Sequence, residues 1–136
     1  MRKHCVLSSF CVAAILAAVA MNGCGDDGNE ADAQLIGAQC TAVADCDDDD
    51  DSTDPLECLT EFGGGYCGRE GCTASSDCPE GSVCVGYAGG FYCFRVCIDK
   101  PDCNANRDAI NESNCSSNVS SVDTDDKVCV PPSSGI

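Results

Sequence analysis

The sequence predicts a small disulfide-rich fold. We expect three tandem modules of short β-hairpins and loops, each held by two disulfides, with no large hydrophobic core. Cysteine accounts for 15 of the 136 residues, whereas the chain has no tryptophan and only seven phenylalanines and tyrosines. A chain so poor in large apolar groups cannot offset the entropy cost of folding by burial alone, so covalent cross-links must contribute.

The cysteines recur in three groups of four, and this repeat is the strongest pattern in the sequence. The groups open with CTAVADC, CTASSDC and CIDKPDC, so that an aspartate, Asp45, Asp77 or Asp102, precedes each second cysteine. The modules are therefore expected at residues 40–71, 72–96 and 97–136, with six disulfides confined within them. The cysteines involved are Cys40, Cys46, Cys58, Cys67, Cys72, Cys78, Cys84, Cys93, Cys97, Cys103, Cys115 and Cys129.

Glycine-rich segments precede the fourth cysteine of the first two groups, at residues 63–67 (GGGYC) and 89–93 (GGFYC). Glycine readily adopts the positive φ that tight turns require, and the aromatic residue and cysteine can then enter an extended strand. Together with the SVCV segment at residues 82–85, this pattern predicts a short β-hairpin.

The N-terminus reads as a signal peptide, because Arg2 and Lys3 precede an apolar run. Cleavage after Ala20 would follow the small-x-small rule and release a secreted chain. The tetrapeptide MNGC that ends at Cys24 resembles a bacterial lipobox. That resemblance implies a signal peptide over residues 1–23 and a lipidated Cys24 as the new N-terminus.

The parity of the cysteines favours the lipobox. Cys5 and Cys11 leave with the signal peptide, and lipid on Cys24 then leaves twelve cysteines, an even set that can pair completely. We therefore expect an exported cell-envelope lipoprotein, anchored in the outer membrane, with a flexible tether over residues 24–39. A freely secreted chain is the alternative.

Charge excludes two classes of partner. The processed chain keeps all 23 acidic residues but only five of the seven basic ones. Nucleic-acid binding and adhesion of the protein surface to anionic lipid both rely on basic groups, so neither is expected. Membrane contact would run through lipid on Cys24.

The spacing C-x5-C-x5-C-x8-C of the second group is similar to the first four cysteines of epidermal-growth-factor-like domains. That resemblance implies disulfides Cys72–Cys84 and Cys78–Cys93. The segment DCPEGSVCVGYAGGFYCFRVC also resembles the N-terminal cysteine-rich region of dickkopf-like proteins and the cysteine-rich lipoproteins of some Gram-negative bacteria. In the animal family this region is a protein-binding or spacer module.

No catalytic, metal or cofactor site is expected. The single histidine, His4, lies in the signal peptide, which rules out Ser–His and Cys–His catalysis in the processed chain. CxxC pairs are absent, and export favours disulfides over zinc thiolates. The acidic run from Asp47 to Asp51 fits no EF-hand register, so we interpret it as a solvated loop; weak calcium binding remains an alternative.

Four aromatic residues of the second module are candidate partner contacts: Tyr87, Phe91, Tyr92 and Phe94. The favoured interpretation is that they cover the disulfides as a miniature core, and the alternative is that they anchor a bound protein.

The leading functional prediction is a non-catalytic binding or spacer module at the cell surface, with a protein or polysaccharide ligand. The alternatives are a secreted disulfide-rich inhibitor of a protease or other enzyme, and calcium-dependent adhesion.

Overall fold

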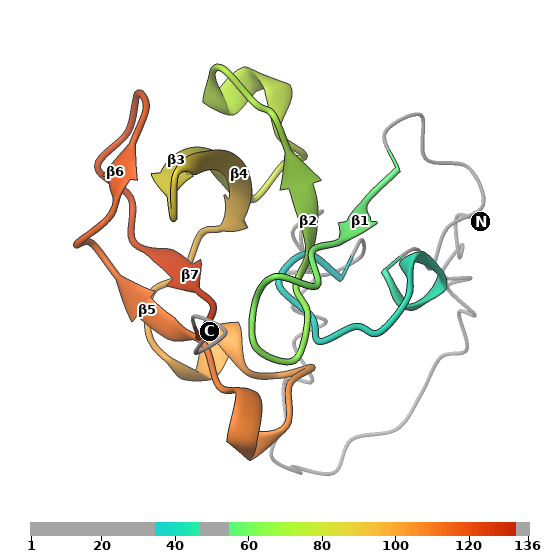
Figure 1. Cartoon of the computed structure of the whole chain (residues 1–136). Helices are drawn as coiled ribbons and strands as arrows, with labels where there is room; N and C mark the ends of the chain where they lie inside the picture. Colours follow the sequence, from blue (N-terminus) through green and yellow to red (C-terminus); the bar gives the residue numbers. More distant parts are fainter. Residues whose placement is uncertain (1–34, 47–54, 133–136) are drawn as a thin grey trace, which may run out of the picture.

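The structure is a computed structural model that describes residues 35–46 and 55–132 (Figure 1). Its regular structure there consists of short strands and single-turn 3-10 helices. The strands are β1 (Glu57–Cys58), β2 (Cys67–Glu70), β3 (Ser82–Tyr87), β4 (Gly90–Arg95), β5 (Asn114–Ser116), β6 (Ser120–Ser121) and β7 (Val128–Val130). The 3-10 helices are η1 (Val43–Asp45), η2 (Ser75–Asp77), η3 (Pro101–Cys103) and η4 (Ala109–Asn111).

The structure contains six disulfides, and each joins two cysteines of the same group of four. We call these groups unit 1 (residues 40–67), unit 2 (72–93) and unit 3 (97–129). In every unit the first cysteine pairs with the third and the second with the fourth, as the growth-factor resemblance implied for unit 2. The bridges are Cys40–Cys58, Cys46–Cys67, Cys72–Cys84, Cys78–Cys93, Cys97–Cys115 and Cys103–Cys129.

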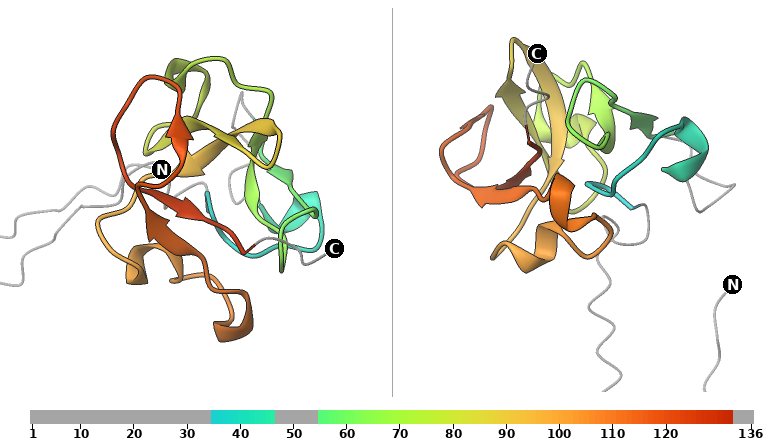
Figure 2. Two further views of the ribbon diagram at one scale, coloured as in Figure 1. Left: turned by 60° about the vertical axis from the view of Figure 1, so that its left-hand side comes forward. Right: turned by 60° about the horizontal axis from the view of Figure 1, so that its bottom comes forward.

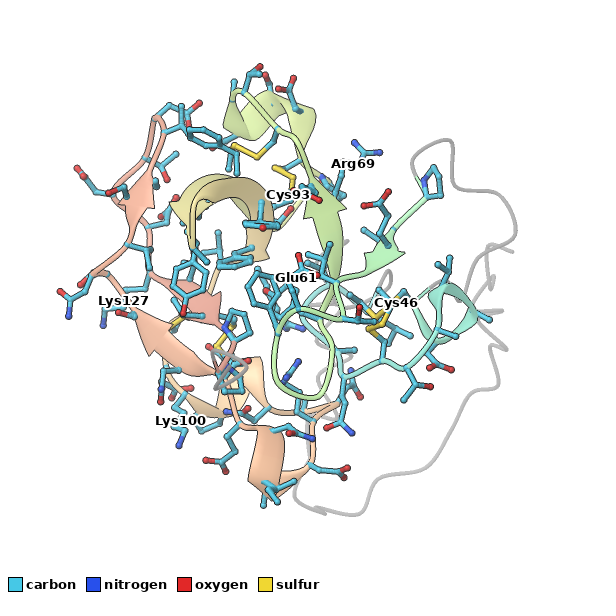
Figure 3. The ribbon with its side chains drawn as sticks, in the orientation of Figure 1. Cys46, Glu61, Arg69, Cys93, Lys100 and Lys127 are labelled. Atoms are coloured by element: carbon cyan, nitrogen blue, oxygen red, sulfur yellow. A yellow bond between two sulfur atoms is a disulfide. The ribbon has the colours of Figure 1, made fainter. Side chains whose placement is uncertain are left out.

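The third and fourth cysteines of each unit also lie directly opposite one another on paired antiparallel strands. These cross-strand partners are Cys58 and Cys67, Cys84 and Cys93, and Cys115 and Cys129. Each strand pair is thus tied by both of its cysteines to the loop that opens the unit. Figure 3 shows the bridges of Cys46 and Cys93 as yellow bonds.

The predicted hairpin of unit 2 is confirmed. β3 and β4 pair from Ser82 with Arg95 to Tyr87 with Gly90, which leaves a two-residue turn. Both turn residues have positive φ, 50° at Ala88 and 88° at Gly89, as hairpins of this length require. Gly90 is the first residue of β4 rather than part of the turn.

The turn formed by the three glycines of unit 1 requires glycine at positions 64 and 65. Gly64 and Gly65 have φ values of 76° and 70°. A Cβ atom on Gly65 would lie 2.1 Å from the carbonyl oxygen of Cys40. The chain then places Tyr66 in the interior and enters β2 at Cys67, as predicted.

The units do not form three separate modules in a row, because one antiparallel sheet runs through all of them. Its strand order is β1-β2-β4-β3-β6, which takes strands from units 1, 2 and 3 in turn. β5 and β7 of unit 3 form a second, two-stranded sheet. Figure 2 shows unit 3, in orange and red, packed against the rest of the molecule.

A small hydrophobic core is likewise shared between the units. Phe62 of unit 1 lies at its centre, with ring centroids 5.2 Å from Tyr92 and 5.8 Å from Phe94 of unit 2. Val128 of unit 3 is fully buried in the same cluster. The buried members are Leu59, Phe62, Tyr66, Val83, Val85, Tyr92, Phe94 and Val128.

The end of the expected tether belongs to the folded body, so that boundary is corrected. Ile36 is only 1% exposed. The Gly37 amide donates to the Cys67 carbonyl, and the Cys67 amide donates to the Ala38 carbonyl. Residues 24–34, the rest of the expected tether, lie outside the described residues.

Because Phe62 joins the units, replacing it should destabilise the whole body. We expect Phe62→Ala to lower the free energy of unfolding by about 3–5 kcal/mol, the usual cost of removing a buried phenylalanine ring. Guanidinium chloride titration with the disulfides intact would measure the change. Phe91→Ala is the matched control, since Phe91 is 53% exposed, and it should cost less than about 1 kcal/mol. Equal losses would contradict a shared core.

Candidate functional site

The aspartate before each second cysteine closes the loop that opens its unit. In unit 2 the carboxylate of Asp77 accepts bonds from the Thr73 amide at 2.8 Å, the Thr73 hydroxyl at 2.8 Å and the Ala74 amide at 3.0 Å. The same three bonds recur in unit 1, between Asp45, Thr41 and Ala42. The repeated aspartates therefore shape the turns η1 and η2.

Unit 3 departs from this pattern at one position. Asp102 accepts bonds from the amides of Ile98 and Asp99, at 2.8 and 3.1 Å, but Ile98 stands where the other units have threonine. The backbone amides, together with the threonine hydroxyl where one is present, favour the charged carboxylate. They hold the pKa of Asp45, Asp77 and Asp102 below the ordinary value.

An open, polar cleft of about 450 Å³ lies between the opening loop of unit 1 and the first spacer of unit 3. It is the candidate binding site. Its lining combines amide, hydroxyl and carboxylate groups with one guanidinium, a composition that suits polar ligands. The lining residues are Gln39, Cys40, Thr41, Asp45, Ala105, Asn106, Arg107 and Asp108.

Arg107 is the only cation among these lining residues, and the fold itself uses it. Its guanidinium donates to the carbonyl oxygens of Gly63 at 2.9 Å and Gly65 at 3.0 Å, which joins unit 3 to the glycine turn of unit 1. Further bonds reach the carbonyls of Gly37 and Asn111, and the group lies 5.8 Å from the centre of the Tyr66 ring. Four of its five N–H groups are thus engaged within the protein.

Partial burial lowers the pKa of Arg107, but a guanidinium remains protonated at any ordinary pH. Its positive charge therefore faces backbone carbonyl oxygens, and these contacts are charge-assisted hydrogen bonds. Arg107 therefore holds units 1 and 3 together, a contact that we call the Arg107 clamp. Only one of its five N–H groups remains for an anionic ligand.

A second link beside the cleft joins Gln39, the residue before unit 1, to unit 3. The Gln39 side chain donates to the Asp108 carboxylate at 2.9 Å and accepts from the Asp108 amide at 3.2 Å. It also accepts from the Asn111 side chain at 3.0 Å. Sequence reasoning missed both Arg107 and Gln39, because the partners that join them to the other unit lie 42 to 72 residues away and produce no local pattern.

The four aromatic candidates for partner contact divide between core and surface. Tyr92 and Phe94 are 6% and 0% exposed and Tyr87 is half-buried, as the core interpretation predicted. Phe91 alone among the four is largely exposed, at 53%. Burial, with the nearby carboxylates of Glu61 and Glu70, raises the pKa of Tyr92; Glu61 is labelled in Figure 3.

Cys24, the predicted lipidation site, lies outside the described residues, and so does the acidic run from Asp47 to Asp51, which we interpret as a solvated loop. Within the described ranges, three clusters of cysteine sulfurs lie close enough together to surround a metal ion. Each of those cysteines is in a disulfide, so it offers no thiolate to a metal.

Comparisons with protein-family models, with curated proteins and with solved structures each found no match. Across residues 35–46 and 55–132 there is no helix long and apolar enough to cross a bilayer.

The lowered pKa of the repeated aspartates predicts a specific loss of stability in acid. Because the folded pKa of Asp77 lies below its ordinary value of 3.8, the unfolded state binds the proton more readily. The stabilisation is therefore complete above about pH 4 and disappears as the pH falls through the lowered pKa. Urea unfolding of Asp77→Asn should show a lower midpoint than the parent at pH 7 and a smaller difference at pH 2. Asp126→Asn, at an exposed position outside these turns, is the control; if it behaves like Asp77→Asn, the turn has no special role.

The Arg107 clamp should require the planar guanidinium and not charge alone. Arg107→Lys keeps the charge but cannot reach all four carbonyls that the planar guanidinium contacts, so we expect a loss of roughly 2–4 kcal/mol in unfolding free energy. Arg69→Lys is the matched control, because the Arg69 guanidinium donates to the carbonyl of Asp77 at 2.9 Å at an exposed site, where a lysine ammonium can take over the contact (Figure 3). It should cost less than about 1 kcal/mol. A lysine at position 107 that preserves full stability would show that the clamp contributes only its charge.

Proposed function

We propose that the chain is a non-catalytic lipoprotein of the cell envelope, whose disulfide-stapled body binds a protein or polysaccharide or holds other molecules apart from the membrane. The observation that carries the proposal is the complete pairing of the twelve cysteines from Cys40 to Cys129. Three cysteines lie outside this set: Cys5 and Cys11 in the expected signal peptide, and Cys24, which follows Gly23 in the lipobox-like tetrapeptide.

Rigidity of the body supports a binding or spacer role. Loops stapled by disulfides lose little conformational freedom when they bind, so a rigid surface reduces the entropy cost of association. Each unit repeats the same disulfide pairing and aspartate turn, which supports treating the body as three variants of one two-disulfide module combined into one fold. The polar cleft between units 1 and 3 is the proposed place for a hydroxyl- or amide-rich ligand.

The length of the linking segment limits how far the body can stand from the membrane. Ten residues separate Cys24 from Leu35, the first described residue. Even fully extended, such a segment spans no more than about 40 Å. A lipid-anchored body would therefore stay close to the bilayer surface, as expected of a short surface spacer.

Replacing Cys24 by serine tests the proposal. We expect Cys24→Ser to release the protein from the membrane fraction, because no lipid can then be attached. Intact mass spectrometry of the parent should give a chain that begins at Cys24, with added lipid and a gain of twelve hydrogens on reduction of six disulfides. Cys5→Ser is the control, since that residue leaves with the signal peptide.

A soluble parent cleaved after Ala20 would overturn the lipoprotein proposal. It would favour the diffusible inhibitor, which protease assays with the purified chain would then test.

A further inference from the structure

Two isoleucines of unit 3 are the most exposed large hydrophobic side chains in the described part of the chain. Ile98 is 85% exposed and Ile110 is 89% exposed. Isolated exposed apolar residues are common on protein surfaces, so exposure alone carries no conclusion. Two further observations distinguish these isoleucines from other exposed apolar residues: their position in the repeat and their place in the fold.

Ile98 replaces a residue that the other two units use for a hydrogen bond. Thr41 and Thr73, at the same position, each donate a hydroxyl to the aspartate of their own turn. Unit 3 keeps the turn through the Ile98 and Asp99 amides but gives up the hydroxyl bond and presents an apolar side chain to solvent. Since threonine would fit the same backbone, folding of the unit does not explain the isoleucine.

The segments that carry the two isoleucines are joined to each other. Lys100, two residues after Ile98, forms an ion pair with Glu112, two residues after Ile110. The Asn104 side chain donates to the carbonyls of Lys100 at 2.8 Å and Ser113 at 3.0 Å. Ile98 and Ile110 thus belong to one connected part of unit 3, which we call the isoleucine surface.

This part of unit 3 lies beside the segment that leads to Cys24. The Gln39 amide donates to the Asn106 carbonyl at 3.0 Å, and the Gln39 side chain bonds to Asp108 and Asn111 on both sides of Ile110. Gln39, four residues after the first described residue, therefore lies next to η4. In the right-hand view of Figure 2, η3 and η4 (orange) lie at the bottom, opposite the end of the β3–β4 hairpin.

We propose that the isoleucine surface rests on the lipid surface into which the acyl chains on Cys24 insert. The inference depends on the proposed lipidation. A lipid anchor with a ten-residue link holds the body at a high effective concentration near the bilayer, so weak apolar contacts suffice to orient it. Lys100 and Glu112 offset each other within this surface, and the exposed carboxylates of Asp99 and Asp108 leave it net negative, which excludes an anionic headgroup layer and leaves a zwitterionic, phosphatidylcholine-like one.

The absence of tryptophan from the chain allows a direct test. We would place a single tryptophan at Ile98, at Ile110 or, as a control, at Phe91 in the full lipidated protein, and bind it to vesicles of phosphatidylcholine with or without bromine on the acyl chains. Ile98→Trp and Ile110→Trp should show blue-shifted emission and quenching by the brominated lipid. Phe91→Trp, which retains an aromatic ring on the hairpin at the far end, should show neither effect.

A second variant separates membrane contact from folding. In the Ile110→Trp background, Ile98→Thr restores the residue found in the other units and should leave the urea midpoint unchanged or higher. Quenching of the tryptophan at position 110 should nevertheless decrease. Unchanged quenching would contradict a joint role for the two side chains.

Flotation with the vesicles distinguishes failure of the inference from failure of the proposed function. If the protein floats and no tryptophan is quenched, or all three are quenched equally, the orientation is wrong while lipidation stands. If the parent does not float with the vesicles, the lipid anchor and the inference fail together.

Discussion

The crossed disulfide pairing within each unit is the constraint on which the rest of the structure depends. The third and fourth cysteines face each other across a strand pair, and each is bonded to a different end of the opening loop. The loop is thereby fastened over the strands at two points. Strands as short as β1, with two residues, would not persist alone in water, but bridges on both sides of the pair remove the freedom to separate.

Contacts of a different kind assemble the three units into one body. Phe62 inserts a ring from unit 1 among the aromatic residues of unit 2, and this burial is favourable and largely non-directional. Arg107 and Gln39 join units 1 and 3 through directed hydrogen bonds to backbone and side-chain groups. Unit 3 also adds β6 to the edge of β3, where the Asp123 carboxylate accepts a bond from the Ser75 amide. Burial thus supplies stability, and the polar contacts determine the relative orientation.

Local features were predictable from the sequence and contacts between units were not. Cysteine spacing indicated the groups that pair, and the glycines at positions 64, 65 and 89 marked turns where positive φ is needed. The same reasoning made no prediction for Phe62 and left Ile36 in a tether. Their burial depends on residues distant in the chain, and a pattern of local spacing cannot indicate such contacts. Of the candidate site, the sequence pointed to Asp45 but could not reveal the cleft that unit 3 forms beside it.

The glycine turn of unit 1 bears on the order in which the units of the chain fold. Its carbonyls at Gly63 and Gly65 are satisfied by Arg107, and the Gly63 amide donates to the carbonyl of Pro132 near the other end of the chain. A chain that emerges N-terminus first can close both bridges of unit 1 before either partner has appeared. In that order, the backbone groups of the turn stay hydrated until unit 3 docks. If both bridges of unit 1 close first, docking of unit 3 is the step that displaces this water.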